Sequence, residues 1–334
     1  MSSTQTEEEI DSLFPEDPTT PSLALIASNN VQITLPYSTG GKDHPIFTLG
    51  SGCRPAKIEG RDAPAAFTAQ TALSDRTLKE GIYFRIENGA QSKFHKAITS
   101  DSHASSEHLS LSGKVSAGGK FAEASVSGSY NKDVVDNQDD MKASIQASIR
   151  TGNIYIDEPR FSLAALADTR RTRTKPSCFP SKYGEYYVAS LKLGADAGVL
   201  ASSASTLHDD SESLDVKAKL RVLWWDIEAS EHEETHSVEA WAEFKATGFD
   251  TLAGENVGGG SRKQTGEVIM DFVERVTDVE ARVRGKMEEF GLTEDKKVDL
   301  EMCRRLCEAG LVVEITLLPY SQVRDYMVAL NQRR

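Results

Sequence analysis

The sequence predicts an α+β fold in which helices cover an antiparallel sheet of long strands. Two observations predict the sheet: regions 102–150 and 208–250 alternate apolar and polar residues over lengths typical of long strands. A third predicts the helices, because apolar side chains in 267–334 recur at helical spacing. We therefore expect one large domain over residues 80–334.

Composition places the chain among globular proteins. Its 334 residues, 39% of them hydrophobic, are enough for a sizeable core. The formal net charge of −13 argues against a nucleic-acid partner, since phosphate binding needs clustered Lys and Arg. Residues 1–22 carry six acidic side chains and no basic one, which predicts a disordered acidic tail.

Before the main domain, residues 23–79 predict a β-rich entry segment of short strands at 23–27, 31–36 and 46–49. A further short strand is expected at 82–86. The one basic run, 170–175, predicts a solvated loop. It is also a candidate contact for an anionic surface or an acidic neighbouring subunit.

In the first alternating region, apolar parity changes by one residue at Gly118-Gly119, as at a bulge or tight turn. The apolar positions before and after that change include Leu109, Leu111, Val115 and Val126. Residues 141–149 alternate as well, but Met141, Ile145 and Ile149 also share one helical face. Strand and helix both remain open for them.

The second region alternates over 214–224 and 238–246, separated by a polar connection. Its apolar parity includes Val216, Leu220, Val222, Val238 and Phe244. Each half reaches the roughly 9 to 11 residues that a transmembrane β-strand needs. A sheet with one face on the core and one in water gives the same alternation, so this pattern alone does not separate the two.

Between these regions lies Tyr183-Gly184-Glu185-Tyr186-Tyr187, followed after six residues by Gly194-Ala195. This spacing resembles the signature of the membrane attack complex/perforin (MACPF) superfamily. Tyr186 stands where many members have His, and Ala195 where many have a second Gly. Small residues allow backbones to cross closely, and Tyr183 and Tyr187 would pack beside the crossing. The alternative is a buried strand with ordinary aromatic packing.

The resemblance implies a MACPF-like bent antiparallel four-stranded sheet, flanked by helical clusters that can become transmembrane β-hairpins. It implies a non-enzymatic pore-forming protein that needs no cofactor. Its partners would be a lipid membrane and further copies in a ring or arc, with a separate membrane-targeting protein as another candidate. The runner-up is a non-lytic intracellular MACPF-like interaction protein.

By the same resemblance, strand 183–195 carries the signature, and Gly258, Gly259 and Gly260 match the glycine-rich bend, or hinge, that the family places after the second hairpin region. A flexible linker is the alternative for these glycines. In a pore, the apolar parity of both hairpin regions would face lipid. These lipid-facing candidates are Leu109, Leu111, Val115, Val126, Val216, Leu220, Val222, Val238 and Phe244.

Residues 1–10 are acidic and polar where a secretory signal would be basic and then apolar. We therefore expect a protein made soluble in the cytoplasm, which could reach target membranes by a route other than the secretory one. Four cysteines are too few for a disulfide framework. Cys303 and Cys307, four apart, favour a shared buried helical face over a metal pair.

His232-Glu233-Glu234-Thr235-His236 fits the HExxH pattern of zinc proteases. That chemistry needs a helix, which directs both histidines to Zn²⁺ while Glu233 acts as base. Here the motif lies in an acidic connection between two alternating strands. A zinc hydrolase through His232 and His236 is therefore a remote alternative.

The C-terminal part predicts a helix over 267–290 and a second over 295–308. Gly310 is expected to end the second helix. A buried strand over 311–318 follows, and then a short helix capped by Ser321.

Overall fold

The computed structural model describes residues 31–37, 47–58, 66–68, 70–99, 104–111, 125–139, 141–203, 244–257 and 265–331. The strands are β1 (Ile33–Pro36), β2 (Gly52–Cys53), β3 (Phe67–Thr68), β4 (Ile82–Thr99), β5 (Met141–Ile156), β6 (Tyr186–Ser203), β7 (Lys245–Asp250), β8 (Glu255–Val257), β9 (Lys296–Lys297) and β10 (Val312–Pro319). The helices are α3 (Pro55–Ile58), α4 (Asp75–Glu80), η2 (Ala104–His108), α6 (Val126–Asp136), α7 (Leu163–Arg171), α8 (Cys178–Tyr183), α10 (Thr265–Thr277), α11 (Val279–Glu289), α12 (Leu300–Glu308), η6 (Tyr320–Gln322) and α13 (Arg324–Asn331), of which η2 and η6 are 3-10 helices.

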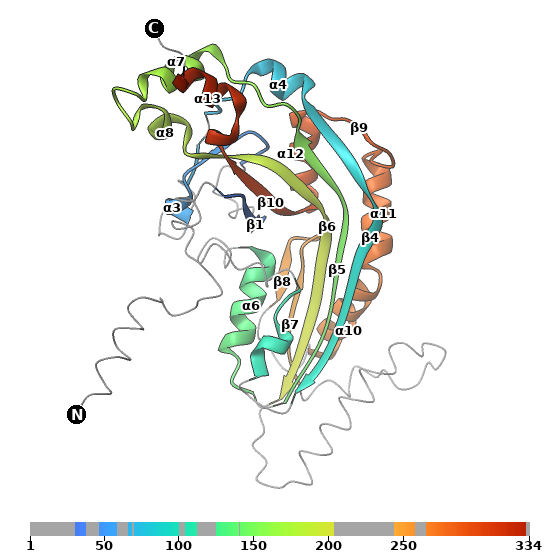
Figure 1. Ribbon diagram of the computed structural model, residues 1–334. Coiled ribbons are helices and arrows are strands. Elements are labelled where there is room, and N and C mark those ends of the chain that lie inside the picture. The colour runs from blue at the N-terminus through green and yellow to red at the C-terminus, as the bar shows by residue number, and fades with distance from the viewer. Residues whose placement is uncertain are drawn as a thin grey trace, which may run out of the picture.

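Three long antiparallel strands, β4, β5 and β6, run side by side and curve along most of the molecule (Figure 1). They have 18, 16 and 18 residues. The described chain therefore contains an α+β fold with a large antiparallel sheet, as the sequence predicted. The described residues contain three strands of this length, in a sheet of ten strands, and the expected fourth long strand is not confirmed.

Strand β6 changes neighbours halfway along. Its first half pairs with β10, from Tyr186 to Leu193, and its second half pairs with β7, from Ala197 to Ser202. The sheet therefore divides at Gly194 and Ala195, where the long strands bend.

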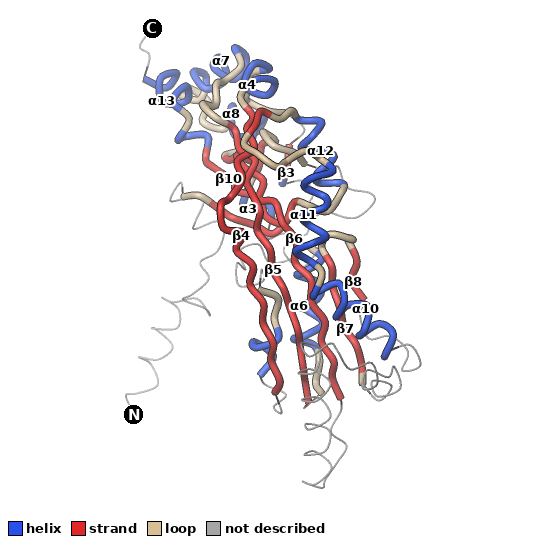
Figure 2. Tube along the Cα trace, turned by 90° about the vertical axis from the view of Figure 1, so that its right-hand side faces the viewer, coloured by secondary structure: helices blue, strands red, loops and turns tan. Residues whose placement is uncertain are grey.

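One face of the long strands packs on α10 and α11, which lie along the sheet in both views (Figures 1 and 2). From Met141 to Ile149, the odd-numbered side chains of β5 point to this face and are buried. The packing is close, because a Cβ added to Gly248 of β7 would lie 2.7 Å from the Phe272 ring of α10. Burial of this apolar face drives the association of the helices with the sheet.

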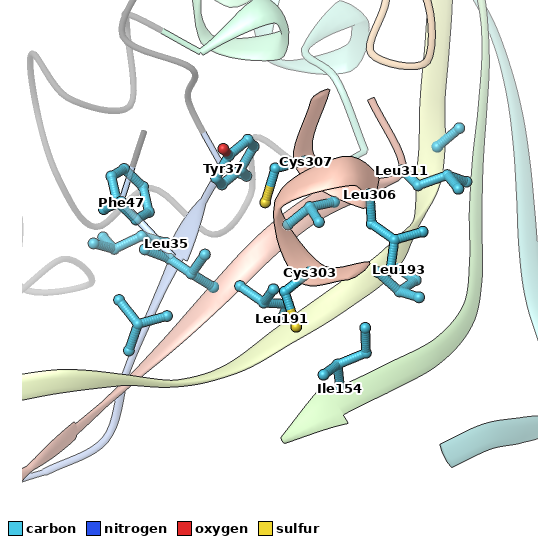
Figure 3. Packing of buried hydrophobic residues seen from close by; sticks show 14 of the residues in the cluster. Leu35, Tyr37, Phe47, Ile154, Leu191, Leu193, Cys303, Leu306, Cys307 and Leu311 are labelled. Carbon is cyan, nitrogen blue, oxygen red and sulfur yellow. The ribbon is translucent and has the colours of Figure 1, made fainter. Parts of the chain in front are cut away.

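Helix α12 covers the other half of the sheet. Cys303, Leu306 and Cys307 are each no more than 1% exposed; Cys303 lies next to Leu191 of β6, and Cys307 lies next to Tyr37 (Figure 3). The predicted shared buried face of the two cysteines is therefore confirmed. Asp299 begins this helix by accepting a hydrogen bond from the Met302 backbone N–H, so α12 starts later than residue 295.

Residues 126–136 form helix α6, so the strand that alternation in region 102–150 predicts is wrong for these residues. Ser125 accepts a hydrogen bond from Gly128 N, as an N-cap does. Tyr130 and Val134, one helical turn apart, are both fully buried. Residues 141–149, which the sequence left open, form strand β5.

Other elements differ in their bounds. The expected short strand at 82–86 continues as β4 to Thr99, past an irregularity in its pairing with β5 between Ile86 and Gln91 that hides the alternation. The expected strand at 46–49 is wrong for residues 47–49, of which Leu49 lies in a turn, and strand 23–27 lies outside the described residues.

The predicted helix over 267–290 is two helices, which meet at Asp278. Strand β10 matches the expected strand closely, and Gly310 ends α12 with a positive φ of 74°. Ser321 lies in η6 and does not cap α13, which begins three residues later.

Candidate functional site

The signature segment begins at the end of a helix and not inside a strand. Tyr183 is the last residue of α8, Gly184 follows with a φ of 81°, and β6 begins at Tyr186. A Cβ at Gly184 would overlap the backbone of Cys53 in β2, and one at Gly52 would overlap the carbonyl of Tyr183. Two backbones cross here at a distance that only glycine permits.

The aromatic side chains of the segment pack around this crossing. Tyr183 and Tyr187 are each 3% exposed. The Tyr183 ring lies 4.9 Å from that of Phe179, and the Tyr187 ring lies 5.1 Å from that of Tyr320, both measured between centroids. The segment therefore joins α8, β6 and the turn after β10 into one aromatic cluster.

Sequence reasoning missed Asp168, which binds the signature from α7. Its carboxylate accepts hydrogen bonds from Lys182 Nζ at 3.0 Å and from the Tyr183 hydroxyl at 3.2 Å. The bond from Lys182 lowers the pKa of Asp168, against the opposing effect of burial. No spacing in the sequence links Asp168 to Tyr183, so only the fold reveals the pair.

Gly194 and Ala195 lie where the sheet divides. A Cβ at Gly194 would overlap the carbonyl oxygen of Ile149 in β5, and Ala195 is fully buried. The pairing of β5 with β6 shifts register at the same level, between Arg150 and Gly152. Small residues therefore let the neighbouring strand approach closely at the bend.

We expect Gly194→Val to lower the free energy of unfolding by roughly 1 to 3 kcal/mol, because the added side chain forces β5 and β6 apart. Thermal or urea unfolding measures this. Gly285→Ala is the matched control, since nothing lies within 4 Å of a Cβ there and alanine favours a helix. Equal stability of Gly194→Val and wild type would contradict close crossing at this residue.

A buried ion cluster, which the sequence analysis did not predict, stabilises the bend of the long strands. Arg150 of β5 donates to Asp196 of β6 through Nη1 at 2.7 Å and Nη2 at 3.1 Å. It donates to Glu314 of β10 through Nε at 2.9 Å and Nη2 at 2.7 Å. Burial would lower the pKa of Arg150, but the two carboxylates outweigh it and raise that pKa. One guanidinium thus joins three strands where β10 leaves the sheet.

The second face of the long strands is polar and lies under residues 104–111 and 125–137, which we call the cover. It contains η2 and α6, and α6 lies across the sheet from α10 and α11 (Figure 1). The even-numbered side chains of β5 on this face are polar and at most 8% exposed. They are Lys142, Ser144, Gln146, Ser148 and Arg150.

His108 joins the cover to the sheet. Its Nε2 lies 2.7 Å from Thr99 Oγ1 of β4, and its Nδ1 lies 2.8 Å from Ser144 Oγ of β5. Its carbonyl accepts hydrogen bonds from Gln146 Nε2 at 2.7 Å and from the Tyr130 hydroxyl at 3.1 Å. Burial, and then the nearby positive charges of Lys142 and His95, lower the pKa of His108 to about 4.

Apolar contact between cover and sheet is confined to a small cluster. Tyr130 and Val134 of α6 pack on Leu200 of β6 and Phe249 of β7, with Leu109 and Val126 against them. The rest of the described cover is held by hydrogen bonds, including Asn137 Nδ2 to Ser202 Oγ at 2.8 Å. The cover is therefore attached mainly by polar contacts.

The structure describes only some of the residues predicted to face lipid. Leu109, Leu111 and Val126 are half-buried in the cover, and Phe244 is 2% exposed just before β7. Val115, Val216, Leu220, Val222 and Val238 lie outside the described residues. The hinge glycines Gly258, Gly259 and Gly260 and the motif from His232 to His236 also lie outside them.

Within the part of the chain that the structure describes, no three His, Cys, Asp or Glu side chains gather as metal ligands would. In the same part, no helix has both the length and the apolar character needed to cross a bilayer.

No family model and no curated protein matches the sequence. Similar solved structures include GNIP1Aa from Chromobacterium piscinae, with 13% identity and a TM-score of 0.30 over 89% of this chain and 55% of that one. A putative cell invasion protein with a MAC/Perforin domain from Bacteroides thetaiotaomicron has 11% identity and a TM-score of 0.27 over 90% and 65%. The cytotoxin protein suilysin from Streptococcus suis has 11% identity and a TM-score of 0.33 over 88% and 62%.

The chain thus spans less than two thirds of each of these proteins. Similarity at this level leaves the function to be argued from the residues of this chain.

Proposed function

We propose that the protein is a MACPF-type pore former. Monomers bind a lipid membrane, associate edge to edge in a ring or arc, and convert two strand connections into the β-hairpins of a shared barrel. No catalytic step is involved. The observation that carries this proposal is the length and position of those two connections.

The first connection joins β4, which ends at Thr99, to β5, which begins at Met141. The second joins β6, which ends at Ser203, to β7, which begins at Lys245. Each therefore has 41 residues, 100–140 and 204–244. Thr99 pairs with Lys142 and Ser202 pairs with Lys245, so both connections leave the same end of the sheet.

Neighbouring antiparallel strands need only a two-residue turn, so both connections are far longer than strand pairing requires. If each connection extended its two flanking strands, every strand would gain about 20 residues. A membrane-crossing strand needs only about 9 to 11. Both connections are thus long enough to cross a bilayer twice.

The polar attachment of the cover supports the same proposal. Removing an apolar cover would expose a large apolar surface to water, at roughly 25 cal/mol per Å². Here departure of the cover exposes Ser144, Gln146 and Lys142, which water can solvate, and apolar surface only at the small cluster around Leu200 and Phe249. Regions with few buried apolar contacts open at the lowest free energies. In a barrel, this polar face would continue as the water-filled lumen.

Ring closure would satisfy the strand edges. Among the described strands, β4 pairs with β5 along its length and with β9 only at Tyr83 and Phe84. The remaining outer edge of β4 can accept a strand from a neighbouring copy. In lipid, an unpaired edge costs several kcal/mol per polar group, so insertion must accompany association.

A disulfide tests whether the cover must leave. Because Met141 already pairs with Ser203, a strand extended to residue 137 would carry Asn137 past the end of β6 and away from Ser202. We expect Asn137→Cys with Ser202→Cys, in a Cys178→Ser background, to bind liposomes but release no trapped dye when oxidised. A reductant should restore release.

Ser202→Cys alone in the same background is the matched control, since it forms no intramolecular bridge. Release by the oxidised double variant, at the rate of this control, would contradict conversion of the first connection. Wild-type protein that binds liposomes of varied composition and never releases dye would instead support a non-lytic interaction protein.

A further inference from the structure

Positive charge gathers at the end of the molecule formed by α7, α8 and α13 (Figure 1). Between Leu163 and Tyr183 the only acidic residue is Asp168. The basic residues of this stretch are all exposed: Arg170, Arg171, Arg173, Lys175 and Lys182. Five positive charges against one negative charge leave +4 here, on a chain whose net charge is −13.

Exposed apolar side chains lie on the same helices. Leu163 of α7 is 86% exposed, and Met327 and Val328 of α13 are 49% and 44% exposed. These are three of the six large apolar side chains exposed in the described residues. Helices α7 and α13 are in contact, and Phe161, just before α7, packs on Tyr326 at 6.3 Å between ring centroids. We call this basic and apolar surface the α7–α13 surface.

The N-terminal part of the chain leaves the fold near this surface. Val31, the first described residue, accepts a hydrogen bond from the Tyr186 hydroxyl at 3.0 Å. Tyr186 is only three residues beyond the end of α8. Thirty residues precede Val31, and an extended chain spans up to about 3.3 Å per residue, so the tail has ample length to reach α7.

The chemistry of the tail complements this surface. Residues 1–22 carry six carboxylates and no basic side chain, a charge of −6 against +4. Within the acidic run, Ile10, Leu13 and Phe14 recur at the i, i+3 and i+4 spacing that brings side chains together on a helix. Arginine pairs with carboxylates through two parallel hydrogen bonds, which favours such a contact.

We propose that residues 1–22 dock on the α7–α13 surface of their own chain. The carboxylates pair with Arg170, Arg171 and Arg173, while Ile10, Leu13 and Phe14 cover Leu163, Met327 and Val328. This surface is far from the end of the sheet where the two 41-residue connections leave. The contact is therefore a second function of the fold, independent of pore formation.

Carbodiimide cross-linking of the full chain tests the contact, because it joins a carboxylate to an amine only when they touch. Peptide mapping of the monomer fraction should show residues 7–17 joined to Lys175 or Lys182. In 1 M salt, where the Debye length falls to about 3 Å, the yield should drop at least fivefold. Arg170→Glu with Arg171→Glu and Arg173→Glu should cause a similar loss.

The matched control makes three Arg→Glu changes at other exposed positions: Arg76→Glu, Arg284→Glu and Arg304→Glu. It should keep the wild-type yield of the tail cross-link. Thermal unfolding checks that both triple variants remain folded. Tail cross-links spread evenly over lysines such as Lys57 and Lys79, cross-links found only in covalent dimers, or none at all would overturn the proposal. The assay contains no membrane, so its failure leaves the proposed pore function standing.

Discussion

Arg150→Met is expected to lower the free energy of unfolding by about 3 to 5 kcal/mol, the usual result of removing one partner from a buried ion cluster. The side chains of Arg150 and Asp196 are 10% and 3% exposed, and that of Glu314 is 19% exposed. Without the guanidinium, two carboxylates from different strands remain close together with little water to solvate them. The loss should appear as a lower urea midpoint.

Two variants separate this effect from a general loss of charge. Combining Arg150→Met with Asp196→Asn and Glu314→Gln removes the unpaired charges, and should recover much of the lost stability. Arg304→Met removes an arginine that also pairs with two carboxylates, but on the exposed surface of α12, where little change is expected. If Arg150→Met unfolds at the wild-type midpoint, the cluster does not hold the bend.

The sequence predicted the fold class because long alternating patterns and helical spacing are local signals. Alternation did not distinguish α6 from a strand, because residues four apart lie on the same face of either structure. Tyr130 and Val134 have this spacing, and both are buried on one face of the helix. Strand β4 was underestimated because its pairing is irregular between Ile86 and Gln91. In both cases the tertiary contacts decided what the local pattern left open.

The residues of the candidate site also differ in whether a local pattern predicts them. Gly194 was predicted because close crossing needs a small residue, and this need is visible in one short stretch. Arg150 and Glu314 are 164 residues apart, and Arg150 and Asp196 are 46 apart. In a chain with 51 acidic residues, no pattern marks the two carboxylates that meet Arg150. Such long-range pairs become visible only when the strand register is known.

His108 lies in the first predicted hairpin region, but only the fold shows which groups it contacts. It faces Thr99 and His95 from β4, Ser144, Gln146 and Lys142 from β5, and Tyr130 from α6. Among the residues that the structure describes, none of the groups that shift the pKa of His108 is a carboxylate. The neutral imidazole fits between the two hydroxyls, whereas the charged form is buried beside other positive charge.

The cover should therefore loosen in acid. The pKa of His108 is about 4 when buried and about 6.5 once the cover opens. Between these values the open state binds a proton that the closed state excludes, so the free energy of opening falls as pH falls from about 6.5 to about 4. The full loss is roughly 3 kcal/mol, from 1.36 kcal/mol per pKa unit. Above pH 6.5 the contribution is complete.

Hydrogen exchange of the α6 amides at pH 7.5 and pH 4.5, corrected for the intrinsic exchange rate, measures this loss. His108→Gln keeps an amide that can bond both hydroxyls but does not titrate, so its protection should change much less. His95→Gln removes only the last of the three causes that lower the pKa of His108, so this variant should keep most of the wild-type pH dependence. Asp133 of α6, whose pKa is raised mainly by burial, favours the closed state as it gains a proton in acid, opposite to His108. Because every variant retains Asp133, the difference between wild type and His108→Gln isolates the histidine. Equal pH dependence in these two proteins would show that His108 does not control the cover.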